Sequence, residues 1–156
     1  MSINKLKLNQ YSILSDSSKT TQKLGWLLAE KISQIKNDSA KVVLLRGDLG
    51  SGKTTFSIGF LKYFGIKPKA ASPTFVLMKH YKSKLKIKEI YHLDAYRLRS
   101  KKDLDTLGFE EILNNSKNIV LIEWPEKISG TKFPFKININ FSYGKEIDDR
   151  FIKISC

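Results

Sequence analysis

A chain of 156 residues with 41% hydrophobic residues is long enough for a substantial core, and we expect one domain over residues 1–156. No window approaches the roughly 18 apolar residues of a membrane span, and residues 1–16 lack the continuous apolar stretch of a secretion signal. The only cysteine is Cys156, which excludes a disulfide within the chain. These features predict a cytoplasmic protein that has no membrane association.

The charge is unbalanced, with 28 Lys and Arg residues against 15 Asp and Glu residues and a net charge of +13. One interpretation is a polyanionic partner such as RNA. The other is a compositional bias, because 24 of the 28 cations are Lys and the better phosphate-binding residue, Arg, is scarce. Charge alone does not decide between the two.

The first half of the chain alternates short apolar strands with helices. We expect strands over residues 11–14 and 41–46, and helices over residues 15–35 and 53–65. The run "KVVLLR" at residues 41–46 is continuously apolar inside its ends, as in a strand buried on both faces of a parallel sheet. Helical spacing places five apolar residues on one face of the first helix: Leu24, Leu27, Leu28, Ile32 and Ile35.

The second half is predicted to contain a hairpin, a helix broken or kinked at Gly108 and three further strands. The hairpin covers residues 75–81 and 85–93, the helix 100–114, a buried strand 118–124, and a closing antiparallel pair 133–141 and 149–155. Strands and helices in this order favour an α/β domain with a mixed sheet.

A glycine-rich loop separates the buried strand at residues 41–46 from the second helix. Gly47, Gly52, Lys53 and Thr54 match the pattern G-x-x-x-x-G-K-[ST]. The glycines permit the tight curl that turns several N–H groups toward phosphates, and the helix that follows adds its positive end. The alternative is an ordinary strand–helix turn that happens to contain a lysine. We predict nucleotide binding by Asp48, Leu49, Gly50, Ser51, Gly52, Lys53, Thr54 and Thr55, in a P-loop NTPase-like three-layer α/β/α fold with a mixed, mostly parallel sheet and antiparallel closing strands.

Two strands end in acids that could hold a metal ion or orient the attacking group. Glu123 follows a purely apolar run, as in a Walker B strand, and Asp94 ends "EIYHLD". A carboxylate at a strand end is also often only a solvated cap. ATP is the default nucleotide because the guanine-reading N-K-x-D is missing, and the D-x-x-G at residues 105–108 lies in a predicted helix.

These motifs, with several others, resemble the TsaE (also called YjeE) family, small P-loop ATPases of bacterial tRNA threonylcarbamoyladenosine synthesis. The resemblance runs from about Thr21 to Arg150, nearly the whole chain. It depends on motifs in order: "TxxLG" (Thr21, Leu24, Gly25), "GDLGSGKTTF" (47–56), "SPTF" (72–75), "YHLDAYRL" (91–98), "GFEE" (108–111) and "LIEWPE" (121–126).

The resemblance implies roles for individual residues. Glu123 is expected to bind Mg²⁺ together with Thr54, and Asp94 to serve ATP hydrolysis. Thr74 lies in a segment that resembles a switch loop responding to the γ-phosphate, and we count it with Asp94 and Lys53 as catalytic. Trp124 is expected close to the nucleotide, although a plain core aromatic is the alternative.

Some neighbours of these motifs have weaker assignments. A hydroxyl or backbone contact at residues 16–18 is a loose candidate for contacting the base or ribose. His92 and Tyr96 are expected to be packed and hydrogen-bonded rather than catalytic. Arg97 is either an ordinary ion-pair former or a contact to a phosphate or to an acidic patch of a partner.

The resemblance implies an ATP-binding, slowly hydrolysing accessory protein that uses Mg²⁺. Such a protein is required for threonylcarbamoyladenosine modification of adenosine 37 in tRNAs reading codons that begin with A. It acts with the TsaD–TsaB complex, and tRNA is contacted directly or through that complex. Lys84, Lys86 and Lys88 alternate along one predicted strand; a solvated edge is the favoured interpretation, and a tRNA contact is the alternative.

Two other function classes stay open. A small-molecule or nucleoside kinase needs a second pocket and usually an Arg-rich lid, but the chain has four Arg and no long insertion. A non-enzymatic nucleic-acid-binding module is supported only by the net charge. ATP binding by the loop separates the first two classes from the third, and a screen of phosphoacceptors separates an ATPase from a kinase.

Overall fold

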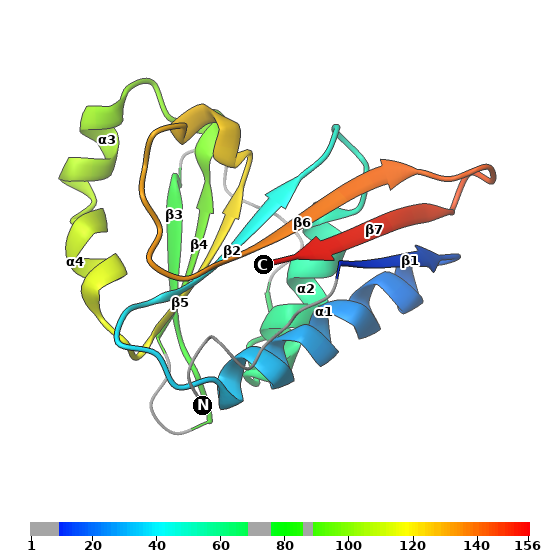
Figure 1. Ribbon diagram of the computed structural model, residues 1–156, viewed down its shortest axis with the longest axis horizontal. Coiled ribbons are helices and arrows are strands. Elements are labelled where there is room, and N and C mark those ends of the chain that lie inside the picture. Colours follow the sequence, from blue (N-terminus) through cyan, green and yellow to red (C-terminus); the bar gives the residue numbers. More distant parts are fainter. Residues whose placement is uncertain (1–9, 69–75, 86–88) are drawn as a thin grey trace.

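The computed structural model describes residues 10–68, 76–85 and 89–156, in which strands form one sheet with helices on both faces (Figure 1). The strands are β1 (Tyr11–Ser15), β2 (Lys41–Arg46), β3 (Met78–Lys82), β4 (Glu89–Asp94), β5 (Asn118–Glu123), β6 (Lys136–Tyr143) and β7 (Arg150–Ser155). The α-helices are α1 (Ser18–Gln34), α2 (Lys53–Tyr63), α3 (Lys101–Thr106) and α4 (Phe109–Asn114), and the 3-10 helices are η2 (Ala95–Arg97) and η3 (Pro125–Ile128).

The seven strands have the order β1-β7-β6-β2-β5-β4-β3. The pairings of β6 with β2, β2 with β5 and β5 with β4 are parallel and form the centre of the sheet. The outer pairings are antiparallel, because the hairpins β3–β4 and β6–β7 bring strands back along themselves and β1 then pairs with β7. The predicted mixed sheet with antiparallel closing strands is confirmed. However, three of the six strand pairings are parallel, so the sheet is half parallel rather than mostly parallel.

The two central strands are buried on both faces because the core has two parts. Val43 and Leu45 of β2 face the cluster under α1 and α2, whereas Val42 and Leu44 face the cluster under α3 and α4. Alternate residues of β5 divide in the same way. Continuous apolar runs at 41–46 and 118–123 therefore produce the three-layer arrangement that the sequence predicts.

Helices α1 and α2 cover one face and pack closely against each other (Figure 1). The hydroxyl of Ser17 caps α1 by accepting a hydrogen bond from the Thr20 N–H at 3.2 Å. Leu27, which the helical spacing places on the buried face, is 40% exposed and is a correction to that expectation. The smaller helices α3 and α4 cover the opposite face, and Gly108, with φ 64°, separates them, so the predicted helix is broken at this residue.

The carboxyl ends of the parallel strands lie at one edge of the sheet. The strand β2 leads directly into the glycine loop, and the neighbouring strands end at Asp94 and Glu123, which are register partners. The edge of such a sheet is where α/β proteins bind ligands. Within the described residues, no helix combines the length and apolar character needed to cross a membrane.

Candidate functional site

The glycine loop curls as the motif requires. Gly50 and Gly52 have φ angles of 75° and 108°, in the left-handed region that favours glycine. At Gly47, an added Cβ would lie 2.7 Å from the backbone oxygen of Phe141, so β6 packs closely against the start of the loop. Side chains at these positions would therefore change the shape of the loop.

Helix α2 begins directly after the glycine loop, and its N-terminus points toward the same edge of the sheet. The first helical hydrogen bond runs from Phe56 N–H to the Gly52 oxygen at 2.9 Å. The amides of Lys53, Thr54 and Thr55 precede it and therefore have no partner within the helix. Together with the helix dipole they form a site that favours an anion.

The side chain of Lys53 is folded back over the loop. It is only 5% exposed, and its Nζ donates hydrogen bonds to the backbone oxygens of Gly47 at 2.5 Å and Asp48 at 2.9 Å. Burial lowers the pKa of Lys53, and the negative charge of Glu123 opposes that shift. The ammonium is thus a partly desolvated cation held at the centre of the loop.

The carboxylate of each predicted acid contacts the side chain of a histidine or an arginine. The carboxylate of Glu123 lies 2.9 Å from His92 Nε2, and that of Asp94 lies 2.9 Å from Arg97 Nε. Asp94 also accepts a hydrogen bond from the Tyr96 N–H at 3.2 Å and so caps η2. The hydrogen bond expected of His92 is present, and Arg97 forms an ion pair. Tyr96, expected to be packed, is instead 60% exposed and is a correction to that expectation.

Trp124 has an unusual backbone conformation immediately after β5. Its φ of 57° is the only positive value at a non-glycine residue in the described part of the chain. Such a conformation is costly for a bulky side chain and is typical of functional sites. It places the indole 4.3 Å from Lys53 Nζ and 5.3 Å from the ring of Tyr96.

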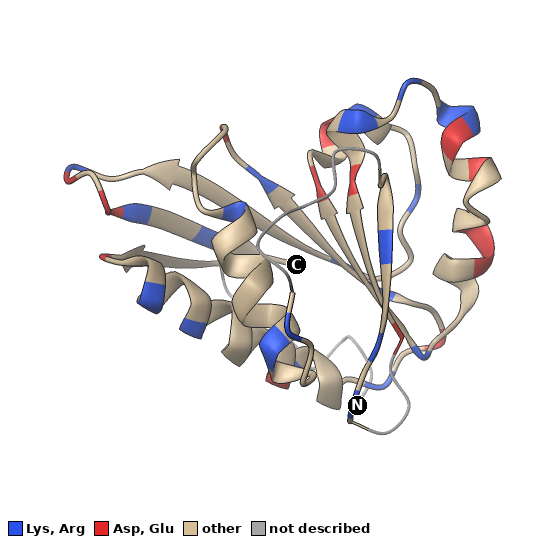
Figure 2. Ribbon diagram, turned by 180° about the vertical axis from the view of Figure 1, so that it is seen from behind, with Lys and Arg blue, Asp and Glu red and all other residues tan. Residues whose placement is uncertain are grey.

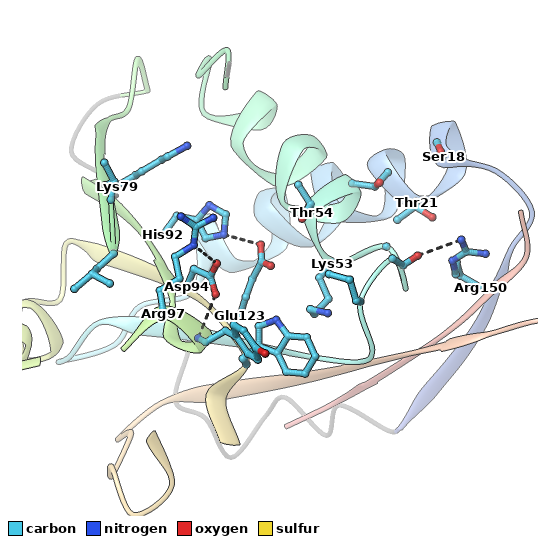
Figure 3. Close-up of a pocket in the computed structure, with 18 of the residues that line it drawn as sticks. Ser18, Thr21, Lys53, Thr54, Lys79, His92, Asp94, Arg97, Glu123 and Arg150 are labelled. Atoms are coloured by element: carbon cyan, nitrogen blue, oxygen red, sulfur yellow. Dashed lines mark hydrogen bonds and ion pairs between the residues drawn. The ribbon is translucent and has the colours of Figure 1, made fainter. Parts of the chain in front are cut away.

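A cavity of about 600 Å³ lies above these groups, within the size range of small-ligand sites. Figure 3 shows Lys53 and Thr54 near its middle, with Asp94 and Arg97 toward one end. The other end is lined by hydroxyl-bearing residues of α1 and by a cation of β7. These residues are Ser18, Thr21 and Arg150.

The structure brings most of the predicted site residues together around this cavity. Those that line it are Leu49, Gly50, Gly52, Lys53, Thr54, Thr55, Asp94, Glu123 and Trp124. Asp48 and Ser51 belong to the loop but do not line the cavity; Ser51 is buried, and its Oγ has no hydrogen-bond partner in the described residues. Thr74 lies outside the described residues.

Sequence reasoning missed two contacts to the loop from β6 and β7. The hydroxyl of Tyr143 donates to the Leu49 oxygen, and Arg150 Nη2 donates to the Gly50 oxygen at 3.2 Å. The residues that form these two contacts are 94 and 100 positions apart, so no local sequence pattern indicates either contact. The available signal was that Arg150, one of only four arginines, stands at the start of a predicted strand.

The basic residues in the described part of the chain are not concentrated at one place. Figure 2 shows Lys and Arg distributed over helices and strands on several sides of the molecule. The predicted lysine ribbon can be followed only in part, because Lys86 and Lys88 lie outside the described residues. The charges of the described residues therefore do not single out a nucleic-acid interface.

A buried strand, a curled glycine loop and a helix within three α/β/α layers define the P-loop NTPase-like class of fold. Comparison with known proteins identifies the family within this class. The model of the family described as threonylcarbamoyl adenosine biosynthesis protein TsaE matches residues 15–151. The chain belongs to the TsaE family, whose proteins serve tRNA threonylcarbamoyladenosine biosynthesis.

Relatives from distant bacteria agree with this assignment. The tRNA threonylcarbamoyladenosine biosynthesis protein TsaE of Rickettsia conorii is 44% identical over 80% of this chain and 67% of its own length. The protein of the same name from Nostoc is 36% identical over 94% of this chain and 87% of its own length. The crystal structure of Bacillus subtilis YdiB is 27% identical, has a TM-score of 0.71, and covers 94% of this chain and 84% of the YdiB chain.

Proposed function

We propose that this chain binds ATP in the cavity at the carboxyl edge of the sheet, with the phosphates against the glycine loop. The observation that carries the proposal is the convergence of helix amides that have no partner within α2 with the nearly buried ammonium of Lys53. The buried hydroxyl of Ser51, which lacks a partner among the described residues, adds a polar group beneath the loop. A triphosphate supplies the negative charge that these groups favour.

Thr54 and Glu123 are the residues that would hold Mg²⁺. Their hydroxyl and carboxylate oxygens are the hard ligands that this ion prefers, and both line the cavity. Within the described residues no cluster of three or more His, Cys, Asp or Glu could hold a metal by itself. A site with few protein ligands fits Mg²⁺, which usually keeps waters and phosphate oxygens and neutralises their charge.

The proposed reaction is hydrolysis of ATP to ADP and phosphate. Water attacks the γ-phosphorus, the bond to the bridging oxygen breaks, and Lys53 stabilises the negative charge on the phosphoryl oxygens. Asp94 would orient the attacking water, and Thr74 would respond to the γ-phosphate. The Arg97 ion pair holds the Asp94 carboxylate in place at the cavity wall.

We further propose that ATP turnover serves the TsaD–TsaB complex in the cytoplasm, where threonylcarbamoyladenosine is formed at adenosine 37 of tRNAs reading codons that begin with A. Membership of the TsaE family supports the pathway. The rim of the cavity has two strongly exposed large side chains, Leu49 at 84% and Tyr96 at 60%. An exposed apolar rim fits a partner that covers the site and completes it.

ATP hydrolysis by the purified chain is expected to be slow and to accelerate when TsaD–TsaB is added. Asp94→Asn should retain ATP binding but lower the hydrolysis rate by about 100-fold, in line with loss of a group that positions the reacting water. Phosphate release measures the rate, calorimetry measures binding, and a pull-down with and without ATP tests the complex. Fast turnover by the isolated chain that TsaD–TsaB leaves unaltered would contradict the proposal, and transfer to an added phosphoacceptor would favour a kinase.

Binding of ATP is also expected to change the fluorescence of Trp124. The ammonium of Lys53 lies against this indole, and we expect it to move toward the phosphates when ATP binds. Trp26, the second tryptophan, packs against Tyr63 and does not line the cavity. A titration of Trp26→Phe should therefore keep the signal change and Trp124→Phe should lose it; the opposite result would place the nucleotide elsewhere.

A further inference from the structure

The hairpin formed by β6 and β7 contacts the glycine loop with two side chains. We propose that Tyr143 and Arg150 are positioning residues that hold the backbone oxygens of Leu49 and Gly50 and so keep the glycine loop in its phosphate-binding conformation. The inference depends on the proposed ATP binding and adds to it the residues that shape the phosphate site. Neither side chain is among those predicted for the site.

The two side chains act from adjacent positions. Tyr143 is the last residue of β6 and pairs in register with Arg150, the first residue of β7. The Tyr143 hydroxyl donates to the Leu49 oxygen, and Arg150 Nη2 donates to the Gly50 oxygen at 3.2 Å. Consecutive carbonyls of the loop are therefore held by paired residues of one hairpin.

The guanidinium of Arg150 is itself fixed. Its Nη1 donates to the oxygens of Ile147 at 2.7 Å and Asp149 at 2.8 Å, and its central carbon lies 5.0 Å from the Tyr143 ring. The planar group thus bridges the hairpin turn and the loop. A lysine at this position would keep the charge but could not make this set of contacts in a fixed plane.

The loop needs such support because side-chain packing does not restrain its outer side. Gly50 has no side chain, and the Leu49 side chain is 84% exposed, so packing does not fix this peptide. In a trans peptide the oxygen and the N–H point in opposite directions. The Tyr143 hydroxyl holds the Leu49 oxygen, so the Gly50 N–H of the same peptide points away from Tyr143.

The next peptide is restrained on both sides. Arg150 holds the Gly50 oxygen, and the Ser51 N–H donates to the Asp48 oxygen at 3.1 Å. Loss of either hairpin contact would free a glycine-containing segment to rotate. The expected consequence is a loop that must be ordered again each time it binds phosphate, at a cost in affinity.

The first experiment uses the nucleotide-free chain, so its result does not depend on ATP binding. Amide order parameters of Gly50 and Ser51 are measured by nitrogen-15 relaxation in wild type, Tyr143→Phe and Arg150→Lys. We expect values typical of rigid backbone in wild type, about 0.85, and values below about 0.6 in both variants. Lys145→Ala, which removes an exposed cation from the same turn, is the control and should match wild type. Unchanged order parameters in both variants would overturn the proposal.

The second experiment compares affinities for ATP and for tripolyphosphate, each with Mg²⁺, by calorimetry. Tyr143→Phe should weaken both ligands by about fivefold, the size expected for one hydrogen bond, while the midpoint of thermal unfolding stays within a few degrees of wild type. Unaltered tripolyphosphate affinity in both variants would overturn the role of the hairpin, as would an Arg150→Lys chain that binds like wild type. A wild-type chain that binds neither ligand would instead overturn the proposed function, and the order parameters would still report on the hairpin contacts.

Discussion

Replacing Lys53 with methionine is expected to weaken ATP binding by about 100-fold, the loss typical of hydrogen bonds between charged groups. Methionine keeps most of the unbranched stem but cannot contact phosphate oxygens. In the free chain the ammonium already bonds to the oxygens of Gly47 and Asp48, at the centre of the curl where the phosphates are proposed to lie. Calorimetric titration with ATP and Mg²⁺ measures the change.

The same substitution should leave the fold intact, which separates a binding defect from misfolding. Burial lowers the pKa of Lys53, so the folded chain carries a cation that it solvates poorly. Removing that charge should change the free energy of unfolding by no more than about 1 kcal/mol. Lys62→Ala, an exposed lysine of the same helix, is the matched control for charge and should bind ATP like wild type. A Lys53→Met chain whose Kd stays within about threefold of wild type would remove the loop from the proposed function.

The central architecture could be predicted because its signals are local. The runs at 41–46 and 118–123 are apolar at every inner position, and that pattern requires covering layers on both faces. Glycines at the loop and at Gly108 marked where the backbone adopts positive φ. The amount of antiparallel pairing was misjudged because the order of strands in a sheet depends on long-range contacts that no local pattern reveals.

In the candidate site, too, local motifs could be predicted from the sequence, whereas long-range contacts could not. The loop, Asp94 and Glu123 were recognisable from short motifs at strand ends, and the structure places them around one cavity. The pairing of Glu123 with His92 could be predicted only from the register between β4 and β5, because the two residues are 31 positions apart. The contacts of Tyr143 and Arg150 could be predicted only from the parallel pairing of β6 with β2, which brings the end of β6 to the loop.

Replacing Gly59 with alanine is expected to destabilise the chain by about 3 kcal/mol or more, a large share of the stability of a small domain. A Cβ at Gly59 would lie 1.9 Å from the backbone oxygen of Gln22, and one at Gly25 would lie 2.2 Å from that of Phe56. The two glycines therefore let α1 and α2 approach backbone to backbone. Helix propensity predicts the opposite sign, a gain of about 1 kcal/mol, so the direction of the change tests the packing. Urea denaturation measures the free energy of unfolding.

The destabilisation is expected because the added methyl group would force the two helices to separate. Backbone atoms cannot rotate away as a side chain can, so an added methyl group must push α1 and α2 apart. Phe56 and Phe60 on α2 are completely buried in the cluster beneath these helices and would lose contacts to the sheet. Lys23→Ala, on the exposed side of α1, adds alanine without a clash and should stay within about 0.5 kcal/mol of wild type. Stability of Gly59→Ala equal to or above that of wild type would mean that the helices lie farther apart than the structure places them. The N-terminus of α2, where the phosphates are proposed to bind, would then be displaced as well.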